Sequence, residues 1–169
     1  MARKLPKILT RSEYLQLMKA EKNKRVRLAM LLGFEAGLRI SEIIGYKDKV
    51  PALTSDKIEP SSIRIESGKG AKDRIVPRPK SFNEGAKKML PLKIARRTLQ
   101  RKVELLGKKV LDKKINFHMF RHGFVTECIN RGLPLHEVQM FAGHSRLDTT
   151  GIYLHADPRK ALERYQEEF

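Results

Sequence analysis

Apolar residues recur at intervals of three and four along most of the 169-residue chain, and this spacing predicts a mainly helical protein. A first helix is expected over 11–22, because Thr10 and Glu13 have the spacing of a capping box at its start. A second helix is expected over 25–36, ending at Gly37. Its continuous apolar run, LAMLLGF, predicts that this helix lies in the core.

The middle of the chain changes from helical spacing to turn-forming and β-prone segments. A short third helix is expected from about Ser41, and the proline-containing stretch 46–62 is expected to be a loop. Segments 63–66 and 74–77 carry β-prone residues on either side of a glycine-rich connector. They predict a small antiparallel β-hairpin.

The second half of the chain returns to helical spacing. Ser81 and Glu84 have capping-box spacing before a short helix, and a longer basic helix is expected over about 92–106. Four further helices are expected, at 118–131, 134–141, 148–155 and 158–168. Because the length fits one hydrophobic core, we expect a mainly α fold with a small antiparallel β-sheet (α+β), in a single domain over 1–169.

Positive charge is the strongest feature of the composition. The chain has 36 Lys and Arg residues against 19 Asp and Glu residues, a formal net charge of +17. Each phosphate that a cation neutralises releases condensed counterions, so nucleic acid is the favoured partner. A ribosome-associated or merely lysine-rich thermostable protein is the alternative, and charge alone does not distinguish DNA from RNA.

Neither a membrane nor secretion is indicated by the sequence. No apolar run approaches the roughly 18 residues of a membrane span, and the N-terminus lacks the apolar stretch of a secretory signal. The lone cysteine, Cys128, has no partner for an internal disulfide. These features predict a cytoplasmic protein that does not contact a membrane.

The segment INFHMFRHGF carries one cluster of candidate chemistry. His118 and Arg121 are three residues apart, so on a helix their side chains would project from one face as converging donors. His122 lies four residues from His118, a spacing typical of zinc ligands, but Met119 stands where a zinc protease has its glutamate. We therefore expect no metal site, and each histidine by itself could be an ordinary surface or core residue.

Two more basic residues stand out elsewhere. Arg39 follows Gly37 within an otherwise apolar stretch, where an arginine needs a carboxylate partner or a bound anion. For Arg39 alone, a salt bridge to Glu35 or Glu42 is the simpler explanation. Lys69 lies at the glycine-flanked tip of the hairpin, and no helix with the Lys-Ser or Lys-Thr of a phosphate-binding P-loop follows it.

The segment GHSRLDTTGIYLH places His144 and Tyr153 nine residues apart. A tyrosine hydroxyl, with a reference pKa of about 10, is a poor nucleophile at neutral pH unless cations or a base surround it. Gly151 weakens the predicted short helix by about 1 kcal/mol relative to alanine, which favours movement of Tyr153. A tight packing contact would explain Gly151 equally well, and a half-buried core position is the alternative for Tyr153.

Four motifs taken together give the chain a joint signature: GLRISEI, GKGAKDR, HMFRHGF and GHSRLDTTGIYLH. With them, the sequence resembles the catalytic domain of the tyrosine recombinase (phage integrase, Xer-like) family over nearly its full length. The resemblance implies that family's catalytic-domain fold. It also implies DNA strand cleavage and rejoining through a covalent 3′-phosphotyrosyl intermediate, as in site-specific recombination or integration. The site it implies is formed by Arg39, Lys69, His118, Arg121, His144 and Tyr153, with Glu42 in support.

The resemblance also implies a role for each catalytic group. Tyr153 would attack the phosphate, which Arg39 and Arg121 would hold through paired N–H donors. Lys69, on a flexible hairpin, is the candidate acid for the leaving hydroxyl. His144 would donate to a phosphate oxygen.

The remaining groups would act around that centre. His118 would orient groups or shuttle a proton, and Glu42 would hold the arginines in position. Exchanging one phosphate ester for another conserves the bond energy, so ATP is not needed. The positive charges at the site are side chains of the protein, so a metal ion is not needed either. We therefore expect no requirement for ATP, a metal or any other cofactor.

The resemblance has limits and leaves rival functions open. Full members of the family resemble a clamp with an N-terminal DNA-binding domain, which we expect to be absent here, and Met119 stands where acidic residues are common. The implied partner is double-stranded DNA, with self-association as a tetramer on it. One alternative is a non-catalytic helix-turn-helix DNA-binding protein, from the pattern over 126–141. Another is DNA relaxation of the type IB topoisomerase kind.

Overall fold

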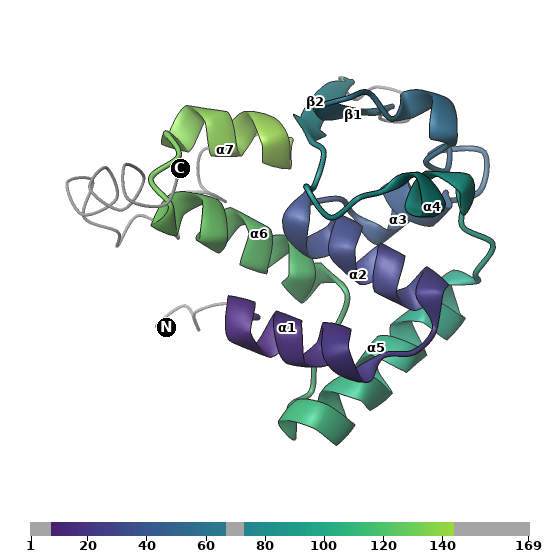
Figure 1. Ribbon diagram of the computed structural model, residues 1–169, viewed down its shortest axis with the longest axis vertical. Coiled ribbons are helices and arrows are strands. Elements are labelled where there is room, and N and C mark those ends of the chain that lie inside the picture. The colour runs from purple at the N-terminus through teal and green to yellow at the C-terminus, as the bar shows by residue number, and fades with distance from the viewer. Residues whose placement is uncertain (1–7, 67–72, 144–169) are drawn as a thin grey trace.

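The computed structural model describes residues 8–66 and 73–143 of the chain (Figure 1). In this part, α-helices make up most of the structure and one two-stranded antiparallel sheet lies at its edge, so the expected mainly α fold with a small β-sheet is confirmed. None of its helices is long and apolar enough to cross a membrane. The elements in chain order are α1 (Arg11–Ala20), α2 (Lys24–Glu35), α3 (Ile40–Ile44), the 3-10 helix η1 (Ser55–Lys57), β1 (Ser62–Ile65), β2 (Arg74–Pro77), α4 (Glu84–Lys88), α5 (Arg96–Leu111), α6 (His118–Asn130) and α7 (Leu135–Ala142).

The first two helices begin and end where short-range chemistry predicts. The Glu13 N–H donates to Thr10 Oγ1 (3.2 Å) and the Thr10 N–H donates to Glu13 Oε2 (2.9 Å), so the capping box of α1 is confirmed. Asn23 caps α2, because its side-chain oxygen accepts from the first backbone N–H groups of the helix. After α2, Gly37 has φ +70°, a left-handed conformation that ends a helix and favours glycine.

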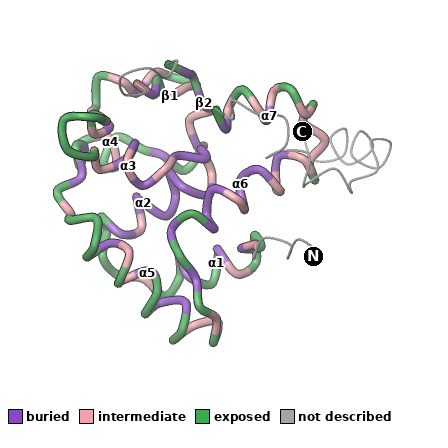
Figure 2. Tube along the Cα trace, turned by 180° about the vertical axis from the view of Figure 1, so that it is seen from behind, coloured by how far each residue is buried: buried purple, intermediate pink, exposed green. Residues whose placement is uncertain are grey.

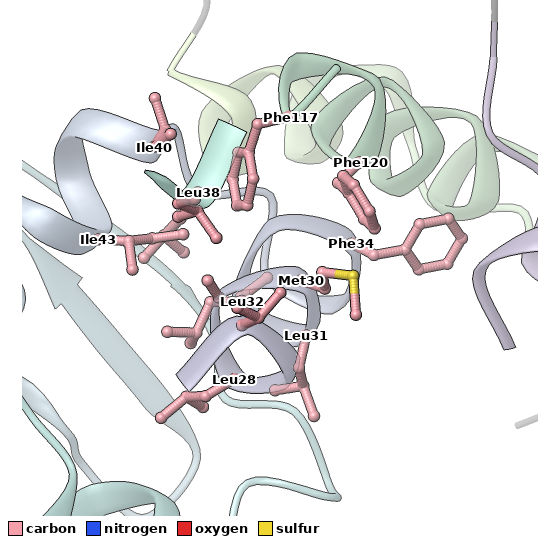
Figure 3. Packing of buried hydrophobic residues seen from close by; sticks show 14 of the residues in the cluster. Leu28, Met30, Leu31, Leu32, Phe34, Leu38, Ile40, Ile43, Phe117 and Phe120 are labelled. Carbon is pink, nitrogen blue, oxygen red and sulfur yellow. The ribbon is translucent and has the colours of Figure 1, made fainter. Parts of the chain in front are cut away.

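Helix α2 lies in the middle of the molecule and most of its residues are buried (Figure 2). Phe34 of α2 stacks on Tyr14 of α1, with 4.1 Å between the ring centroids. Side chains of α2 and α6, such as Phe34 and Phe120, meet in this core (Figure 3), and two glycines let the two helices approach closely. A Cβ atom on Gly33 would lie 3.0 Å from Phe120 Cβ, and one on Gly123 would lie 2.4 Å from Phe34 Cε2. The apolar run of α2 therefore forms the core, as expected.

The β-hairpin turns one apolar face inward. Ile63 pairs with Val76 and Ile65 pairs with Arg74, and all four side chains are buried. Ile75, between two buried neighbours on β2, points outward and is 53% exposed. This alternation follows from the two-residue period of a strand, and it places one arginine on the inner face.

The start of α4 differs from the expected capping box. Asn83 is the N-cap, because its Oδ1 accepts from the Ala86 N–H (2.9 Å). The Ser81 hydroxyl instead donates to a carboxylate oxygen of Glu35 on α2 (3.1 Å). Ser81 and Glu84 have the right spacing, but a long-range partner holds Ser81 and a closer residue can cap the helix.

Helix α5 is displaced from its expected range of 92–106 and covers Arg96–Leu111. Leu92 is buried, but it lies in the turn before the helix, and an apolar residue of a turn adds to the same periodicity. At the other end, Asp112 adopts a left-handed conformation (φ 47°) that stops the helix. The expected loop over 46–62 also contains the single turn of η1.

Helices α6 and α7 are the helices expected at 118–131 and 134–141, and they lie next to each other (Figure 1). The turn between them contains Gly132, whose φ of 83° is left-handed. Their facing sides form a second, smaller apolar cluster of Phe124, Val125, Cys128, Val138 and Ala142. Helix α7 also packs against β2. The two helices expected at 148–155 and 158–168 lie outside the described residues.

Candidate active site

Three of the predicted catalytic residues line one hollow of about 230 Å³. Arg39, from the start of α3, meets His118 and Arg121, from the first turn of α6. Ser41 of α3 and Arg96 and Gln100 of α5 complete its polar lining. None of the described residues that line the hollow is a carboxylate. Three arginines and one histidine, with no acid among the residues of the wall, make a site suited to an anion.

Arg121 is held rigidly at the wall of this hollow. Its side chain is 2% exposed, and its Nη1 donates to the Gly37 carbonyl (2.6 Å) while its Nη2 donates to the Ala142 carbonyl. The backbone groups that follow α2 and end α7 are therefore joined through one guanidinium. These two contacts use two of the five N–H groups of an arginine. The expected common face of His118 and Arg121 on a helix is confirmed.

Arg39 has the carboxylate partner that its apolar setting requires. Its backbone N–H donates to Glu42 Oε2 (2.7 Å) and its Nη1 donates to Glu42 Oε1 (2.9 Å). Glu35, the other candidate partner, instead accepts from Tyr14 and Ser81. The Arg39 side chain is 39% exposed, so it also faces solvent at the hollow. Arg39 therefore has both a salt bridge and a side-chain surface that is open to solvent.

Glu42 is a buried carboxylate between two arginines. Burial raises the pKa of Glu42, but hydrogen bonds from Arg74, its positive charge and smaller contributions from Arg39 outweigh burial and hold that pKa at about 2. Arg74 donates from Nη1 to Glu42 Oε1 (2.6 Å) and from Nη2 to Glu42 Oε2 (2.9 Å). Glu42 is therefore ionised and fixed from both sides, the arrangement expected of a residue that holds Arg39.

Arg74 is the residue at this site that sequence reasoning missed. It belongs to β2, and its side chain is 6% exposed. One signal was available: in the segment RIV, the alternation that makes Ile75 outward and Val76 inward also turns Arg74 inward. An arginine on the buried face of a strand needs a carboxylate, and only the tertiary structure shows that this is Glu42.

Comparison with known proteins identifies the family of the chain. The model of the phage integrase family matches residues 7–160. The chain belongs to the phage integrase family. The expected resemblance to tyrosine recombinases is thereby confirmed, and the catalytic-domain fold with it.

Individual relatives of this phage integrase family member are recombinases. Tyrosine recombinase XerA of Thermococcus onnurineus is 36% identical over 168 residues, which are 88% of this chain and 58% of that relative. The crystal structure of XerA recombinase superposes with a TM-score of 0.73 at 25% identity, covering 99% of this chain and 65% of the other. A pre-cleavage complex of XerH site-specific recombinase with its difH substrate has a TM-score of 0.66 at 25% identity, covering 96% of this chain and 54% of the other. The chain thus spans less than two thirds of each.

Two histidines of this family member share one end of α6. The rings of His118 and His122 meet edge to face, with 4.4 Å between centroids. Partial burial, then the charges of Arg121 and Arg39, lower the pKa of His118. Burial, then His118 and Arg121, lower the pKa of His122 to about 4. Both rings are therefore neutral near pH 7, each with one N–H donor and one acceptor nitrogen.

The two histidines also line a second, larger hollow of about 550 Å³ that shares Gln100 with the first. Glu104, Lys114 and Asn116 supply most of its other polar groups. Within residues 8–66 and 73–143, no cluster of three or more His, Cys, Asp or Glu side chains has an arrangement that could hold a metal ion. The chemistry of this end of α6 is that of neutral imidazoles beside arginines.

The described residues do not include three of the predicted catalytic residues, which are Lys69, His144 and Tyr153. Gly151 also lies outside them. Their described neighbours in sequence are part of the site. Arg74 lies five residues after Lys69, and Gly143, directly before His144, accepts a hydrogen bond from Arg39 Nη2 (3.4 Å). The remaining predicted catalytic residues therefore lie in the sequence just before Arg74 and just after Gly143.

Proposed function

We propose that this chain breaks and rejoins DNA strands in site-specific recombination, with Tyr153 as the nucleophile. The hollow that Arg39, His118 and Arg121 share is the observation that supports this most strongly. These residues come from separate segments of a phage integrase family member, and they surround a space lined with basic and neutral groups. A phosphodiester is the anion that such a chain would bind there.

In this proposal, the two arginines stabilise the negative charge that builds on the non-bridging oxygens as phosphorus becomes five-coordinate. Arg39 is the more exposed of the two and would contact the non-bridging oxygens directly. Arg121 is fixed by the Gly37 and Ala142 carbonyls, so its charge needs no reorganisation during the reaction. Loss of one such donor typically costs about 3 kcal/mol of transition-state stabilisation, a hundredfold or more in rate.

The covalent step is an exchange of one ester for another. The Tyr153 hydroxyl would give its proton to the neutral His118 ring or to water, and its oxygen would attack phosphorus. The bond from phosphorus to the 5′ oxygen would break, and the DNA 3′ end would stay on the enzyme as a phosphotyrosyl ester. Lys69 would donate the proton that the leaving 5′ hydroxyl takes, and His144 would donate to a phosphate oxygen. His118, neutral near pH 7, would orient these groups or relay a proton.

The proposal requires neither ATP nor a metal ion. The phosphotyrosyl ester keeps the energy of the broken bond, and the freed 5′ hydroxyl can attack it to reverse the step. Protein side chains supply the positive charge that a metal would otherwise provide.

Double-stranded DNA is the proposed partner, with assembly as a tetramer on paired sites. The net charge of +17 suits the phosphate backbone. XerH, which shares this fold and 25% of the aligned residues, binds its difH substrate as a site-specific recombinase.

The covalent intermediate gives the decisive test. The protein is incubated in EDTA with a labelled pool of nicked duplexes of randomised sequence, and SDS gels are examined for a protein–DNA adduct. We expect an adduct with the wild-type chain and none with Tyr153→Phe, because phenylalanine lacks the attacking oxygen. Tyr46→Phe is the matched control, since Tyr46 is an exposed tyrosine that the mechanism does not use.

Each other outcome has a defined meaning. An adduct that survives in Tyr153→Phe, or none with any duplex, contradicts the proposed chemistry. Dependence of the wild-type adduct on added Mg²⁺ contradicts the metal-free mechanism. Relaxation of a supercoiled plasmid without strand exchange would instead indicate the topoisomerase activity.

A further inference from the structure

We propose that Arg74 is a positioning residue for DNA cleavage, which locks Arg39 and the end of α7 into the geometry of the phosphate site. The inference rests on the proposed function and adds a residue to it. Arg74 itself does not line the hollow that holds Arg39 and Arg121, so it would act through its neighbours.

Arg74 joins three elements through three different nitrogen atoms. Its Nη1 and Nη2 donate to the two carboxylate oxygens of Glu42 on α3 (2.6 and 2.9 Å). Its Nε donates to the carbonyl of Phe141 on α7 (2.8 Å). Its own backbone belongs to β2 and pairs with Ile65. One guanidinium therefore joins the hairpin, α3 and α7.

The Glu42 end of this clamp controls Arg39. Both carboxylate oxygens accept from Arg39 as well, one from its backbone N–H and one from Nη1. A carboxylate with both oxygens engaged on both sides has no freedom to rotate. Loss of Arg74 would release one side of Glu42, so Arg39 would gain orientations that do not face the hollow.

The α7 end of the clamp depends on close contact. Gly143 has φ +59°, and a Cβ atom there would lie 2.9 Å from Arg74 Cδ and 3.1 Å from its Nε. The arginine side chain thus lies against the backbone of the residue directly before His144. In the other direction along the chain, Arg74 lies five residues after Lys69. His144 therefore follows a residue that Arg74 contacts, and Lys69 lies in the sequence segment just before the strand of Arg74.

Lysine cannot replace this arrangement. A lysine has one nitrogen, whereas the three contacts of Arg74 use three nitrogens in a planar fork. Small displacements of groups that orient a reaction can lower its rate about 100-fold. Arg74→Lys keeps the positive charge beside Glu42 and removes the fork, so it isolates positioning from charge.

The test measures single-turnover formation of the Tyr153 adduct on saturating nicked duplex. We expect Arg74→Lys to be about 10-fold slower than wild type and Arg74→Met about 100-fold slower, with DNA affinity within about twofold. Arg64→Lys and Arg64→Met are the matched controls. Arg64 belongs to the same hairpin, but its side chain is exposed and its ion-pair partner is Glu59 (2.8 Å) and not Glu42, so both controls should cleave at the wild-type rate. If Arg74→Met does not fold, Arg74→Lys carries the test.

A second substrate separates positioning from general structural support. In a methylphosphonate, a methyl group replaces one non-bridging oxygen of the scissile phosphate and removes its charge. Because Arg74 would act by aiming cations at that charge, the difference in rate between wild type and Arg74→Lys should shrink several-fold on this substrate. A loosened fold would slow both substrates equally.

The outcomes distinguish this inference from the proposed function. Cleavage by Arg74→Lys and Arg74→Met within twofold of wild type overturns the inference, and so does an equal defect on both substrates. If the wild-type chain forms no adduct, the proposed function fails first. Amide hydrogen exchange at the end of α7 then still tests the clamp, which is overturned if Arg74→Lys speeds exchange no more than Arg64→Lys.

Discussion

At the scale of single residues, the site depends on what surrounds each charge. Arg39 and Arg64 each pair with a glutamate at nearly the same distance, 2.9 and 2.8 Å. Glu42 is almost fully buried, whereas Glu59 is 38% exposed. Solvent screens an exposed pair, but a buried carboxylate that loses its charge leaves its cations without compensation. The two pairs should therefore respond very differently to the same substitution.

We predict that Glu42→Gln lowers the free energy of unfolding at pH 7 by about 3 kcal/mol, because Arg39 and Arg74 lose the charge they share. Urea denaturation measures this. Glu59→Gln, the matched control on the surface, should leave the free energy of unfolding unchanged within experimental error. Equal losses in the two variants would contradict the role of burial.

The Glu42 effect should also depend on pH in one direction. Its pKa is about 2 in the folded chain and 4.5 ordinarily, so its contribution is complete above pH 4.5 and is lost as the pH falls towards 2. The difference between wild type and Glu42→Gln should therefore shrink by about 1–2 kcal/mol between pH 7 and pH 3. A constant difference over this range would mean that the charge of Glu42 is not what stabilises the fold.

At the scale of elements, local sequence patterns predicted the existence of the helices more accurately than their first and last residues. The capping box of α1 and the left-handed glycine after α2 are local features, and both are present as expected. The start of α4 differs because Ser81 contacts Glu35, which is far away in sequence. Helix α5 differs because an apolar residue in a turn has the same spacing as one in a helix. Boundaries therefore depend on contacts that periodicity does not contain.

The start of α4 can be tested by two alanine substitutions. We predict that Asn83→Ala destabilises the chain by about 1 kcal/mol, because the Ala86 N–H loses its acceptor. Ser81→Ala should cost less than half as much, since it removes only an exposed hydrogen bond to Glu35. Urea denaturation of both variants makes the comparison. A larger loss for Ser81→Ala would show that Ser81 is the cap after all.

At the scale of the whole molecule, the fold collects positive charge around one anion-sized hollow. The positive charge of its lining comes from Arg39 at the start of α3, Arg96 of α5 and Arg121 of α6. When these cations neutralise DNA phosphates, they release the counterions that were condensed on the DNA. Affinity should therefore depend steeply on salt concentration.

We predict that the affinity for duplex DNA falls by about 10³-fold or more between 50 and 200 mM salt, the loss expected for six or more phosphate contacts. Fluorescence anisotropy with a labelled duplex at several salt concentrations measures the slope. Reversal by dilution back to low salt is the control for unfolding or aggregation. A slope near zero would exclude the phosphate backbone as the main source of affinity.

The sequence by itself determined the fold class, the central place of α2, the hairpin and the joint signature of the phage integrase family. These features depend on residues close together in the chain, where helix and strand periods, caps and glycine conformations operate. Only the tertiary structure decided that Arg39 pairs with Glu42 and not with Glu35, and that Arg74 holds the other side of Glu42. One choice joins residues 32 positions apart, and the other is between partners three and four residues from Arg39, so burial and packing, and not local propensity, select among them.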